Sequence, residues 1–397
     1  MQINYITGYA GTGKSTALLK LLESINPLNS VVLCPTHKAI KRLTDSLPNP
    51  DIEIKTIHAL LGWVPGINES AEHVNHIDVT IKLDRAIDTY KTIIIDEGGM
   101  MSEDMLMEIT SKLEESNDFE TEGITIYIFL ALYQLLPVKG KQIQIDEETT
   151  TRLTVQHRAE SPDVVALFTK FVNFLEGTNK QDLKINYSEN VIKIDKIIDF
   201  NLSKDRLLAY TNECVGYYNQ EIAKTLGISS YEGQFVQLGN YSLPVKVDKF
   251  IKPTLARLLT EYENGTLWLQ NNQINSKFIK ESLKALIDHK DIDFITVNDI
   301  VIPVVVGIHK AQIVKKQAKA DCVKDKSNFK WLYALDRAFT MDYTFASTVH
   351  KAQGSEFERV FIVKDDIQKA IINNYYDTYA RLMYVAISRA RKKVFII

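Results

Sequence analysis

A phosphate-binding loop is the feature that most constrains this chain. Residues 8–15 read Gly-Tyr-Ala-Gly-Thr-Gly-Lys-Ser and fit the pattern GxxxxGK(S/T). The segment 3–7 predicts a short buried strand before the loop, and the leucines between positions 18 and 22 predict a helix after it. Glycines let the backbone approach a phosphate closely, and the helix N-terminus faces the anion. The sequence therefore predicts a nucleotide site rather than a chance glycine-rich turn.

Two side chains of the loop have expected roles at the phosphates. Lys14 would reach the β- and γ-phosphates, and the Ser15 hydroxyl would bind Mg²⁺. The residues expected to contact the nucleotide are Gly8, Gly11, Thr12, Gly13, Lys14, Ser15 and Thr16.

Two acidic residues follow a run of three isoleucines at 93–95. Carboxylates at the C-terminal end of a buried strand are where a phosphate-loop enzyme holds Mg²⁺ and orients water. We expect Asp96 to bind the metal, directly or through water, and Glu97 to polarise the attacking water as general base. A solvated acidic turn is the alternative, and the neighbouring phosphate loop disfavours it.

Alternating strand-like and helix-like segments indicate an α/β fold with a mostly parallel sheet. Ser102 is expected to cap a helix whose apolar face includes Ile109. The polar stretch 62–90 predicts an inserted subdomain or hairpin, and short β-like runs between 241 and 334 predict a small β-rich insertion. The other expected elements are strands at 31–34, 124–130, 207–210, 360–363 and 394–397, and helices at 163–175 and 376–389.

Length, net charge and cysteine content limit the kind of protein this can be but do not identify its function. A chain of 397 residues favours two to four units. The net charge of −3 neither predicts nor excludes a nucleic-acid partner, because the local field matters more than the total. Cys34, Cys214 and Cys322 lie far apart, as in a reduced compartment. With no apolar run of membrane-spanning length and no signal peptide before the first strand, we expect a cytoplasmic protein without a membrane partner.

The chain also carries two motifs near its C-terminal end, Ser347–Gly354 and Tyr384–Arg391. With them the sequence resembles the superfamily 1 helicases, most of all the RecD-like and Dda-like branch called 1B, in a compact form similar to phage helicases. The resemblance runs through most of the chain in the expected order. Its segments are 8–15, 35–39, 56–58, 96–97, 133–138, 153–158, 347–354 and 384–391.

This resemblance implies two RecA-like lobes that close on ATP and Mg²⁺. The first lobe would be 1–150, with an insertion at 63–90 that could act as a strand-separating pin. The second would be 151–240 together with 335–397. The β-rich insertion 241–334 would form a small barrel-like domain that steadies DNA.

The same resemblance implies roles at the nucleotide. Arg389 would be an arginine finger and Arg158 a second cation at the γ-phosphate. Gln134 would sense that phosphate and couple the lobes, while Gln353 and Gly354 would lie near the nucleotide. For Arg389 the alternative is a basic helix end favoured by the helix dipole.

Single-stranded nucleic acid would contact hydroxyl, amide, imidazole and ammonium groups, which hold phosphates without reading sequence. Each position could equally be an ordinary loop residue. Trp63 is a candidate for base stacking or for a core, and the lysines of 309–330 could hold DNA or form a solvated face. The candidate contacts are Thr36, His37, Lys38, Thr56, His58, Thr211, Asn212, Thr348, His350 and Lys351.

Two departures from the family pattern affect these expectations. The glutamine-containing segment that reads adenine has no counterpart, because the first strand begins at residue 2. The Gly-Asp pair that opens motif III is replaced by Leu130-Ala131. We therefore expect the hydrolysis residues to be retained and the coupling of hydrolysis to movement to be weakened.

The resemblance implies an ATP-dependent DNA helicase or translocase that moves 5′ to 3′ on single strands as a monomer and acts at junctions of single- and double-stranded DNA. The alternative is an ATP-binding accessory protein that binds nucleic acid with little or no motor activity. Nothing in the residues separates DNA from RNA, or replication from recombination and repair.

Overall fold

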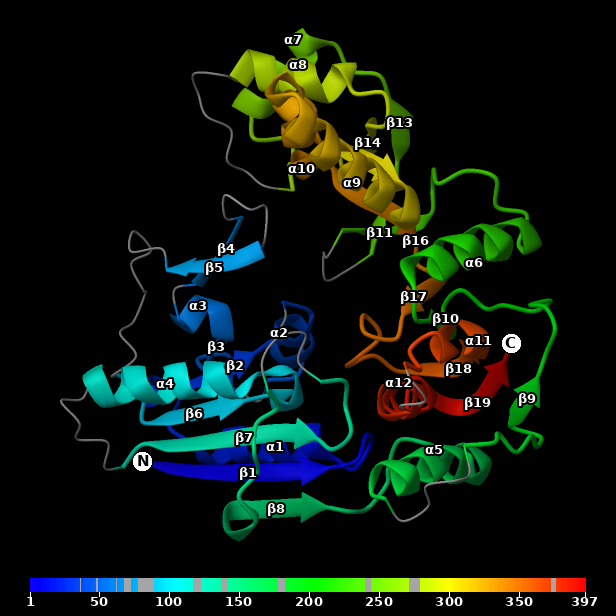
Figure 1. The fold of residues 1–397 in the computed structure, drawn as a ribbon. Coiled ribbons are helices and arrows are strands. Elements are labelled where there is room, and N and C mark those ends of the chain that lie inside the picture. Colours follow the sequence, from blue (N-terminus) through cyan, green and yellow to red (C-terminus); the bar gives the residue numbers. More distant parts are fainter. Residues whose placement is uncertain are drawn as a thin grey trace. The chain divides into compact units, whose positions relative to one another are not determined.

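The computed structural model in Figure 1 divides by packing into two compact units. The first consists of Met1–Val191, Gln353–Glu356 and Ile371–Lys393, and the second of the remaining segments. These units cut across the sequence-derived boundary at residue 150, and the lobe boundaries stay a prediction. The structure describes residues 1–35, 37–47, 49–61, 63–67, 73–77, 89–116, 123–136, 141–177, 183–239, 244–270, 279–372 and 376–397.

The first unit is built on a six-stranded parallel sheet in the order β3-β2-β6-β7-β1-β8. Parallel strands buried on both faces read as continuous apolar runs, which explains the Ile93–Ile95 and Val31–Cys34 segments. The strands expected near 3–7, 31–34, 93–95 and 124–130 are therefore confirmed. The bounds are β1 Gln2–Gly8, β2 Ser30–Cys34, β3 Glu53–Thr56, β6 Thr92–Ile95, β7 Thr125–Ala131 and β8 Thr150–Leu153.

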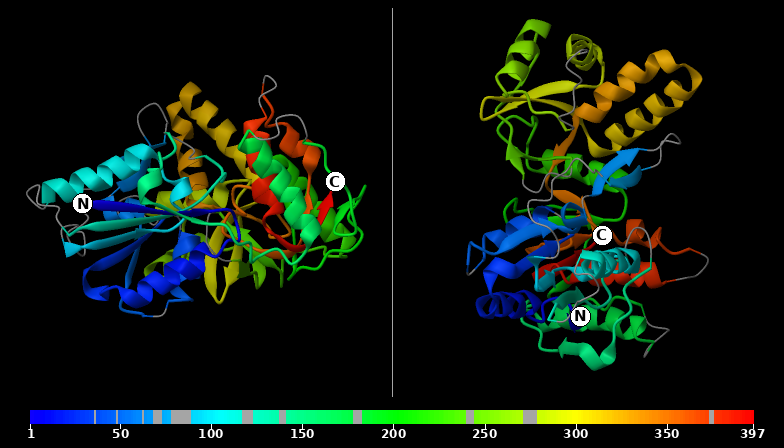
Figure 2. Two further views of the ribbon diagram at one scale, coloured as in Figure 1. Left: turned by 90° about the horizontal axis from the view of Figure 1, so that it is seen from below. Right: turned by 90° about the vertical axis from the view of Figure 1, so that its left-hand side faces the viewer.

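Helices cover both faces of this sheet (Figure 2, left). Because successive strand residues point to opposite faces, Val32 packs with helices α1 and α2, whereas Val31 packs with α3 and α4. The Ser102 hydroxyl accepts a hydrogen bond from the Met105 N–H at 3.3 Å, as a cap for α4 should. The bounds are α1 Lys14–Ser24, α2 His37–Thr44, α3 Ile57–Leu61 and α4 Glu103–Ser116.

Three further parts complete the first unit. Strands β4 (Trp63–Ile67) and β5 (His73–Ile77) pair antiparallel, so the described part of the 62–90 insertion is a hairpin. Helices α5 (Pro162–Leu175) and α12 (Asp377–Ile387) pack together through edge-to-face rings, such as the pair Phe168–Tyr384 with centroids 6.1 Å apart. Short 3-10 helices occupy Pro27–Asn29, Gly98–Met100 and Glu147–Thr149.

The second unit contains a sheet in the order β17-β10-β18-β19-β9, in which β10 is parallel to both β17 and β18. Helix α6 packs on it through Val215 and Ile222. The strands expected at 207–210, 360–363 and 394–397 are confirmed. The bounds are β9 Val191–Lys193, β10 Asp205–Ala209, α6 Asn212–Thr225, β17 Ala346–Thr348, β18 Phe357–Ile362, α11 Lys364–Gln368 and β19 Ala390–Ile396.

The insertion differs from the β-rich expectation. Its strands belong to a mixed sheet in the order β12-β11-β16-β15-β14-β13, but helices make up more of its described residues than strands do. Helix α7 shows why, since Leu255, Leu258, Leu259 and Tyr262 follow helical spacing and join the core over this sheet. The bounds are β11 Phe235–Leu238, β12 Val245–Lys246, β13 Lys249–Ile251, α7 Leu255–Glu263, α8 Ile279–Asp288, β14 Asp293–Val297, β15 Ile300–Val306, α9 Ile308–Lys324, α10 Phe329–Arg337 and β16 Phe339–Tyr343, with a 3-10 helix at Lys326–Asn328.

In the part of the chain that the structure describes, no helix combines the length and apolar character that crossing a membrane requires.

Helix α4 offers a matched pair for testing the core of the first unit. Ile109 is fully buried under the sheet, whereas Met107 in the same helix is 61% exposed. We expect Ile109→Ala to lower the free energy of unfolding by about 3 kcal/mol, because it leaves a cavity in a packed core. Met107→Ala should change it by less than about 0.5 kcal/mol. Urea denaturation followed by circular dichroism measures both, and equal midpoints would contradict this view of the core.

Candidate nucleotide-binding site

The phosphate loop connects β1 to α1 and depends on its glycines. Gly11 and Gly13 have φ values of 83° and 85°, in the left-handed region that favours glycine. A Cβ on Gly11 would overlap the side-chain amide of Gln156 and the Cβ of Arg158. The sequence pattern thus reflects a loop whose backbone is closely covered by the segment after β8.

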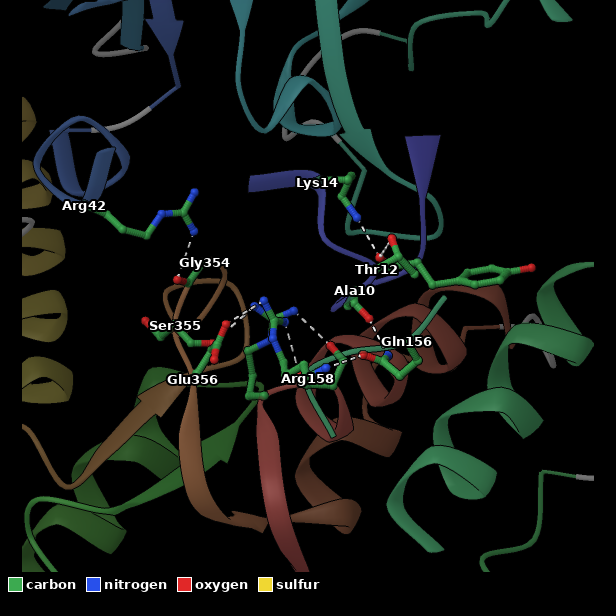
Figure 3. Close-up of polar contacts among 12 residues, drawn as sticks. Ala10, Thr12, Lys14, Arg42, Gln156, Arg158, Gly354, Ser355 and Glu356 are labelled. Atoms are coloured by element: carbon green, nitrogen blue, oxygen red, sulfur yellow. Dashed lines mark hydrogen bonds and ion pairs between the residues drawn. The ribbon is translucent and has the colours of Figure 1, made fainter. Parts of the chain in front are cut away.

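Two residues that the sequence did not single out hold this loop in place. The Gln156 side-chain amide donates to the Ala10 carbonyl at 2.6 Å, and the Ala10 N–H donates to the Tyr384 hydroxyl at 2.7 Å. Figure 3 shows the Gln156 contact. Tyr384 is fully buried, although it lies 374 residues from Ala10 in the sequence. The loop is therefore fixed from both sides by side chains of the first unit.

Lys14 lies along the loop, where its Nζ donates to the carbonyls of Gly8 at 2.9 Å and Tyr9 at 2.6 Å. The pKa of Lys14 is lowered to about 8, chiefly by burial; the charges of Arg158 and Arg389 contribute to this lowering, and the carboxylates of Glu97 and Asp96 oppose it. Ser15 and Thr16 are exposed at the start of α1. The loop thus presents hydroxyl groups to solvent beside a cation that burial destabilises.

The two carboxylates lie at the C-terminal end of β6. Asp96 is 6% exposed, and burial together with the charge of Glu97 raises its pKa to about 6. Burial would raise the pKa of Glu97 too, but the Arg42 charge and a hydrogen bond from Gln134 Nε2 at 2.6 Å hold it below its ordinary value. Glu97 and Tyr133 have φ values of 53° and 61°, which is strained for residues other than glycine.

Arg42 on α2 is the cation that pairs with these carboxylates, and sequence reasoning missed it. Its guanidinium lies 2.9 Å from Asp96 Oδ2 and 3.6 Å from Glu97 Oε1. The same group donates to the Gly354 carbonyl at 3.2 Å, as Figure 3 shows. Arg42 lies in the second turn of α2, and its place in the sequence does not indicate Asp96, Glu97 or Gly354 as its partners.

The predicted cations Arg158 and Arg389 lie near each other in the first unit. Arg158 forms an ion pair with Glu356 at 2.8 Å (Figure 3) and donates to the Ser388 carbonyl at 3.3 Å. Arg389 is 4% exposed and donates to the Val385 carbonyl, the Ser355 carbonyl and the Ser388 hydroxyl. Burial and the Arg158 charge lower the pKa of Arg389 to about 10. Glu356 is a further residue that sequence reasoning missed.

A hollow of about 290 Å³ opens between these groups. Two buried polar atoms near it, Gln134 Oε1 and Gln353 Nε2, have no hydrogen-bond partner among the described residues, and neither has Arg158 Nε. Its charged side chains can contact a phosphate-bearing ligand, and the Ser15 hydroxyl and Asp96 carboxylate are oxygen donors of the kind Mg²⁺ prefers. Leucines of α1 and α2 form the apolar part of the wall. The full lining comprises Ser15, Leu18, Leu19, Arg42, Leu43, Ser46, Asp96, Arg158, Gly354 and Glu356.

The candidate nucleic-acid residues are only partly described. Thr36 lies outside the described residues, and His37 and Lys38 are in α2 with side chains that are likewise outside them. In the first unit the Thr56 hydroxyl accepts from the Ala59 N–H at 3.0 Å, so it caps α3, which contains His58. Trp63 belongs to β4, and its side chain also lies outside the described part.

In the second unit the candidate threonines cap turns as well. The Thr211 hydroxyl donates to Asp366 at 2.9 Å and accepts from the Cys214 N–H, so it caps α6 at Asn212. The Thr348 hydroxyl accepts from the Lys351 N–H at 3.3 Å, and His350 is exposed between them. These hydroxyls therefore shape the loops, and Thr211 has already used its donor.

The departure in motif III has a structural explanation. Leu130 and Ala131 are 2% and 3% exposed at the end of β7, where the strand still pairs with β1. An aspartate at 131 would place a charge in this buried position. Introducing the family's Gly-Asp pair at 130 and 131 is therefore a poor way to test how ATP hydrolysis is coupled to movement. The turn instead follows at Tyr133.

Comparisons with known proteins agree with this geometry. Residues 1–123 match the family described as AAA domain, and residues 343–397 match the UvrD-like helicase C-terminal domain. An uncharacterized protein of Methanocaldococcus jannaschii is 22% identical over 454 aligned positions, covering 100% of this chain and 36% of that protein. The chain thus spans little more than a third of the length of this curated relative.

Solved helicase structures share the fold. A Bacteroides Pif1 helicase bound to single-stranded DNA superposes with a TM-score of 0.51 at 16% identity, covering 100% of this chain and 88% of that one. A Pif1 helicase from Candida albicans gives 0.47 at 15% identity, with coverages of 100% and 91%. The fold is therefore the α/β helicase fold with two RecA-like lobes. The two domain matches, in this order on that fold, make the chain similar to the superfamily 1 helicases.

Proposed function

We propose that this chain hydrolyses ATP to move along single-stranded DNA, 5′ to 3′, and to unwind duplex DNA at junctions. The observation that carries the proposal is the charge arrangement of the first unit. The phosphate loop with Lys14, the Asp96–Glu97 pair, and the cations Arg158 and Arg389 act on one another electrostatically. A site that only bound a nucleotide would not need an acid pair and two arginines beside the loop.

Each residue would contribute a distinct part of phosphoryl transfer to water. Lys14 would leave the loop carbonyls and bind the β- and γ-phosphates. Glu97, whose carboxylate is held by the Gln134 amide, would orient water and take its proton. Arg158 and Arg389 would stabilise the charge that develops on the transferred group, which requires them to exchange main-chain carbonyls for phosphate oxygens.

Ser15 and Asp96 would hold Mg²⁺. Bound there, the ion would neutralise phosphate charge and fix the terminal phosphate for attack. Asp96 can hold the metal only when its carboxyl group is ionised.

The DNA partner is proposed from the similarity to superfamily 1 helicases and from the loops that carry the candidate contacts. The similar Bacteroides helicase is bound to single-stranded DNA. The direction of movement, action as a monomer, the role of the 63–90 insertion as a pin and the choice of DNA over RNA rest on the resemblance alone. A role in replication, recombination or repair is compatible with such a motor.

ATP hydrolysis with and without single-stranded DNA tests the proposal. We expect DNA to stimulate turnover of the parent protein strongly and Lys14→Ala to abolish it, because the loop loses its phosphate-binding cation. Lys20→Ala is the matched control, since Lys20 is an exposed lysine of the same helix, and it should behave as the parent does.

Two outcomes would count against the motor. Negligible turnover by the parent with DNA still bound would favour the alternative of a nucleotide-binding accessory protein. Stimulation of ATP turnover by RNA but not by DNA would make RNA the nucleic acid on which the protein acts.

The pKa of Lys14 gives a pH dependence with a definite sign. Phosphate binding favours the charged lysine, and a pKa of about 8 leaves an increasing fraction neutral as the pH rises. We expect full ATP affinity below pH 8 and a loss approaching tenfold per pH unit above it. Equilibrium binding of a fluorescent ATP analogue between pH 7 and 9.5 measures this. The residual binding of the ATP analogue by the Lys14→Ala variant should not show this pH dependence. An affinity of the parent protein that rises with pH would refute the assignment of Lys14 as the cation that binds phosphate.

A further inference from the structure

Arg42 is the one cation of the described site that contacts both carboxylates. The other cations there are held by other partners: Lys14 by loop carbonyls, Arg158 by Glu356, and Arg389 by main-chain carbonyls and a hydroxyl. Arg42 reaches Asp96 at 2.9 Å from the rim of the hollow, with its own side chain 37% exposed. It is therefore accessible enough to move, unlike Arg389.

The contact occupies the oxygen that a metal would use. Asp96 Oδ1 accepts a hydrogen bond from the Glu97 N–H at 3.0 Å, and Oδ2 accepts from Arg42. A divalent ion beside Asp96 would lie within a few ångströms of the guanidinium, where like charges repel strongly in a partly desolvated site. Metal and arginine therefore compete for one carboxylate.

We propose that Arg42 is a positioning residue that acts as the resident counter-ion of Asp96 and Glu97 and opposes binding of a divalent cation without nucleotide. This inference rests on the proposed function, because it assigns a regulator to the same metal site. Mg²⁺ is bound in such sites by one or two carboxylates plus substrate phosphates. The phosphates of ATP supply the negative charge that shifts the competition towards the metal.

The second contact of Arg42 gives this exchange a structural consequence. The guanidinium donates to the Gly354 carbonyl at 3.2 Å, and Gly354 has a φ of 72°. A Cβ at Gly354 would stand 3.4 Å from Arg42 Nη1, which is tighter than usual. Because one guanidinium makes both contacts, through Nη2 to Asp96 and Nη1 to Gly354, a movement of the whole side chain away from a bound metal would also remove the hydrogen bond between α2 and segment 353–356. Metal loading is thereby linked to a segment that also carries Glu356, the partner of Arg158.

Binding of Mn²⁺ alone tests the inference without any activity measurement. Mn²⁺ takes the same oxygen ligands as Mg²⁺, and electron paramagnetic resonance reports its free concentration. At pH 8 and low salt, we expect Arg42→Gln to bind one Mn²⁺ at least about tenfold more tightly than the parent, because a repelling charge is removed. Arg42→Lys keeps the charge and should stay within about threefold of the parent.

Two controls locate the effect. Lys41→Gln removes the same charge from the exposed side of the same helix and should bind Mn²⁺ as the parent does. The double variant Arg42→Gln with Asp96→Asn should lose the gained affinity, because the metal ligand is gone. Circular dichroism checks that each variant is folded.

The results separate the inference from the proposed function. If Arg42→Gln binds Mn²⁺ no more tightly than Lys41→Gln, or less tightly, the inference is overturned. A second titration with Mn²⁺ and ATP together reports on the function. If the parent fails to bind this complex, or binds it as well after Lys14→Ala, the proposed nucleotide site fails, whatever the free-ion titration gives.

Discussion

Two carboxylates buried side by side at the end of a strand impose the main electrostatic constraint on the first unit. Asp96 and Glu97 follow a buried apolar strand, and carboxylates in such a place need cations or hydrogen-bond donors close by. Arg42 and Gln134 meet this need directly, and the charges of Lys14 and Arg389 also act on Glu97. Helix α2 and the turn after β7 supply the two direct partners, and segment 353–356 accepts a hydrogen bond from the same Arg42.

The features that sequence predicted are those that a local pattern determines. The phosphate loop must have glycines where φ is positive, and its strand and helix must bury apolar residues beside it, so residues 1–24 were predicted closely. The strand before Asp96 and the Ser102 cap follow from equally local rules. The helices α7–α10 were not predicted, because the β-like runs 294–297 and 300–306, which are strands β14 and β15, dominated the interpretation of the insertion, although the spacing in α7 is helical.

The partners of the site could not be predicted, because they come from distant parts of the chain. Arg42 contacts a residue 312 positions away, and the tyrosine that fixes the loop is more distant still. Gln156 and Tyr384 lie inside the family-like segments 153–158 and 384–391, but those segments did not indicate that these two side chains hold the phosphate loop, and Glu356 lies outside every such segment. The nucleic-acid contacts of the candidate threonines stay a prediction. In the structure the hydroxyls of Thr56, Thr211 and Thr348 accept main-chain hydrogen bonds in turns, a local role that their motif positions did not indicate.

The left-handed backbone at Glu97 and Tyr133 has a consequence for engineering this protein. Glycine at either position would relieve strain, and routine stabilisation would select it. At 133 it would also remove a ring that stacks with Tyr9, at 6.3 Å between centroids, and that lies 6.0 Å from the Arg381 guanidinium. At 97 it would remove the carboxylate itself. Gains in thermal resistance at these two positions would therefore remove side chains that belong to the proposed nucleotide site or contact its loop.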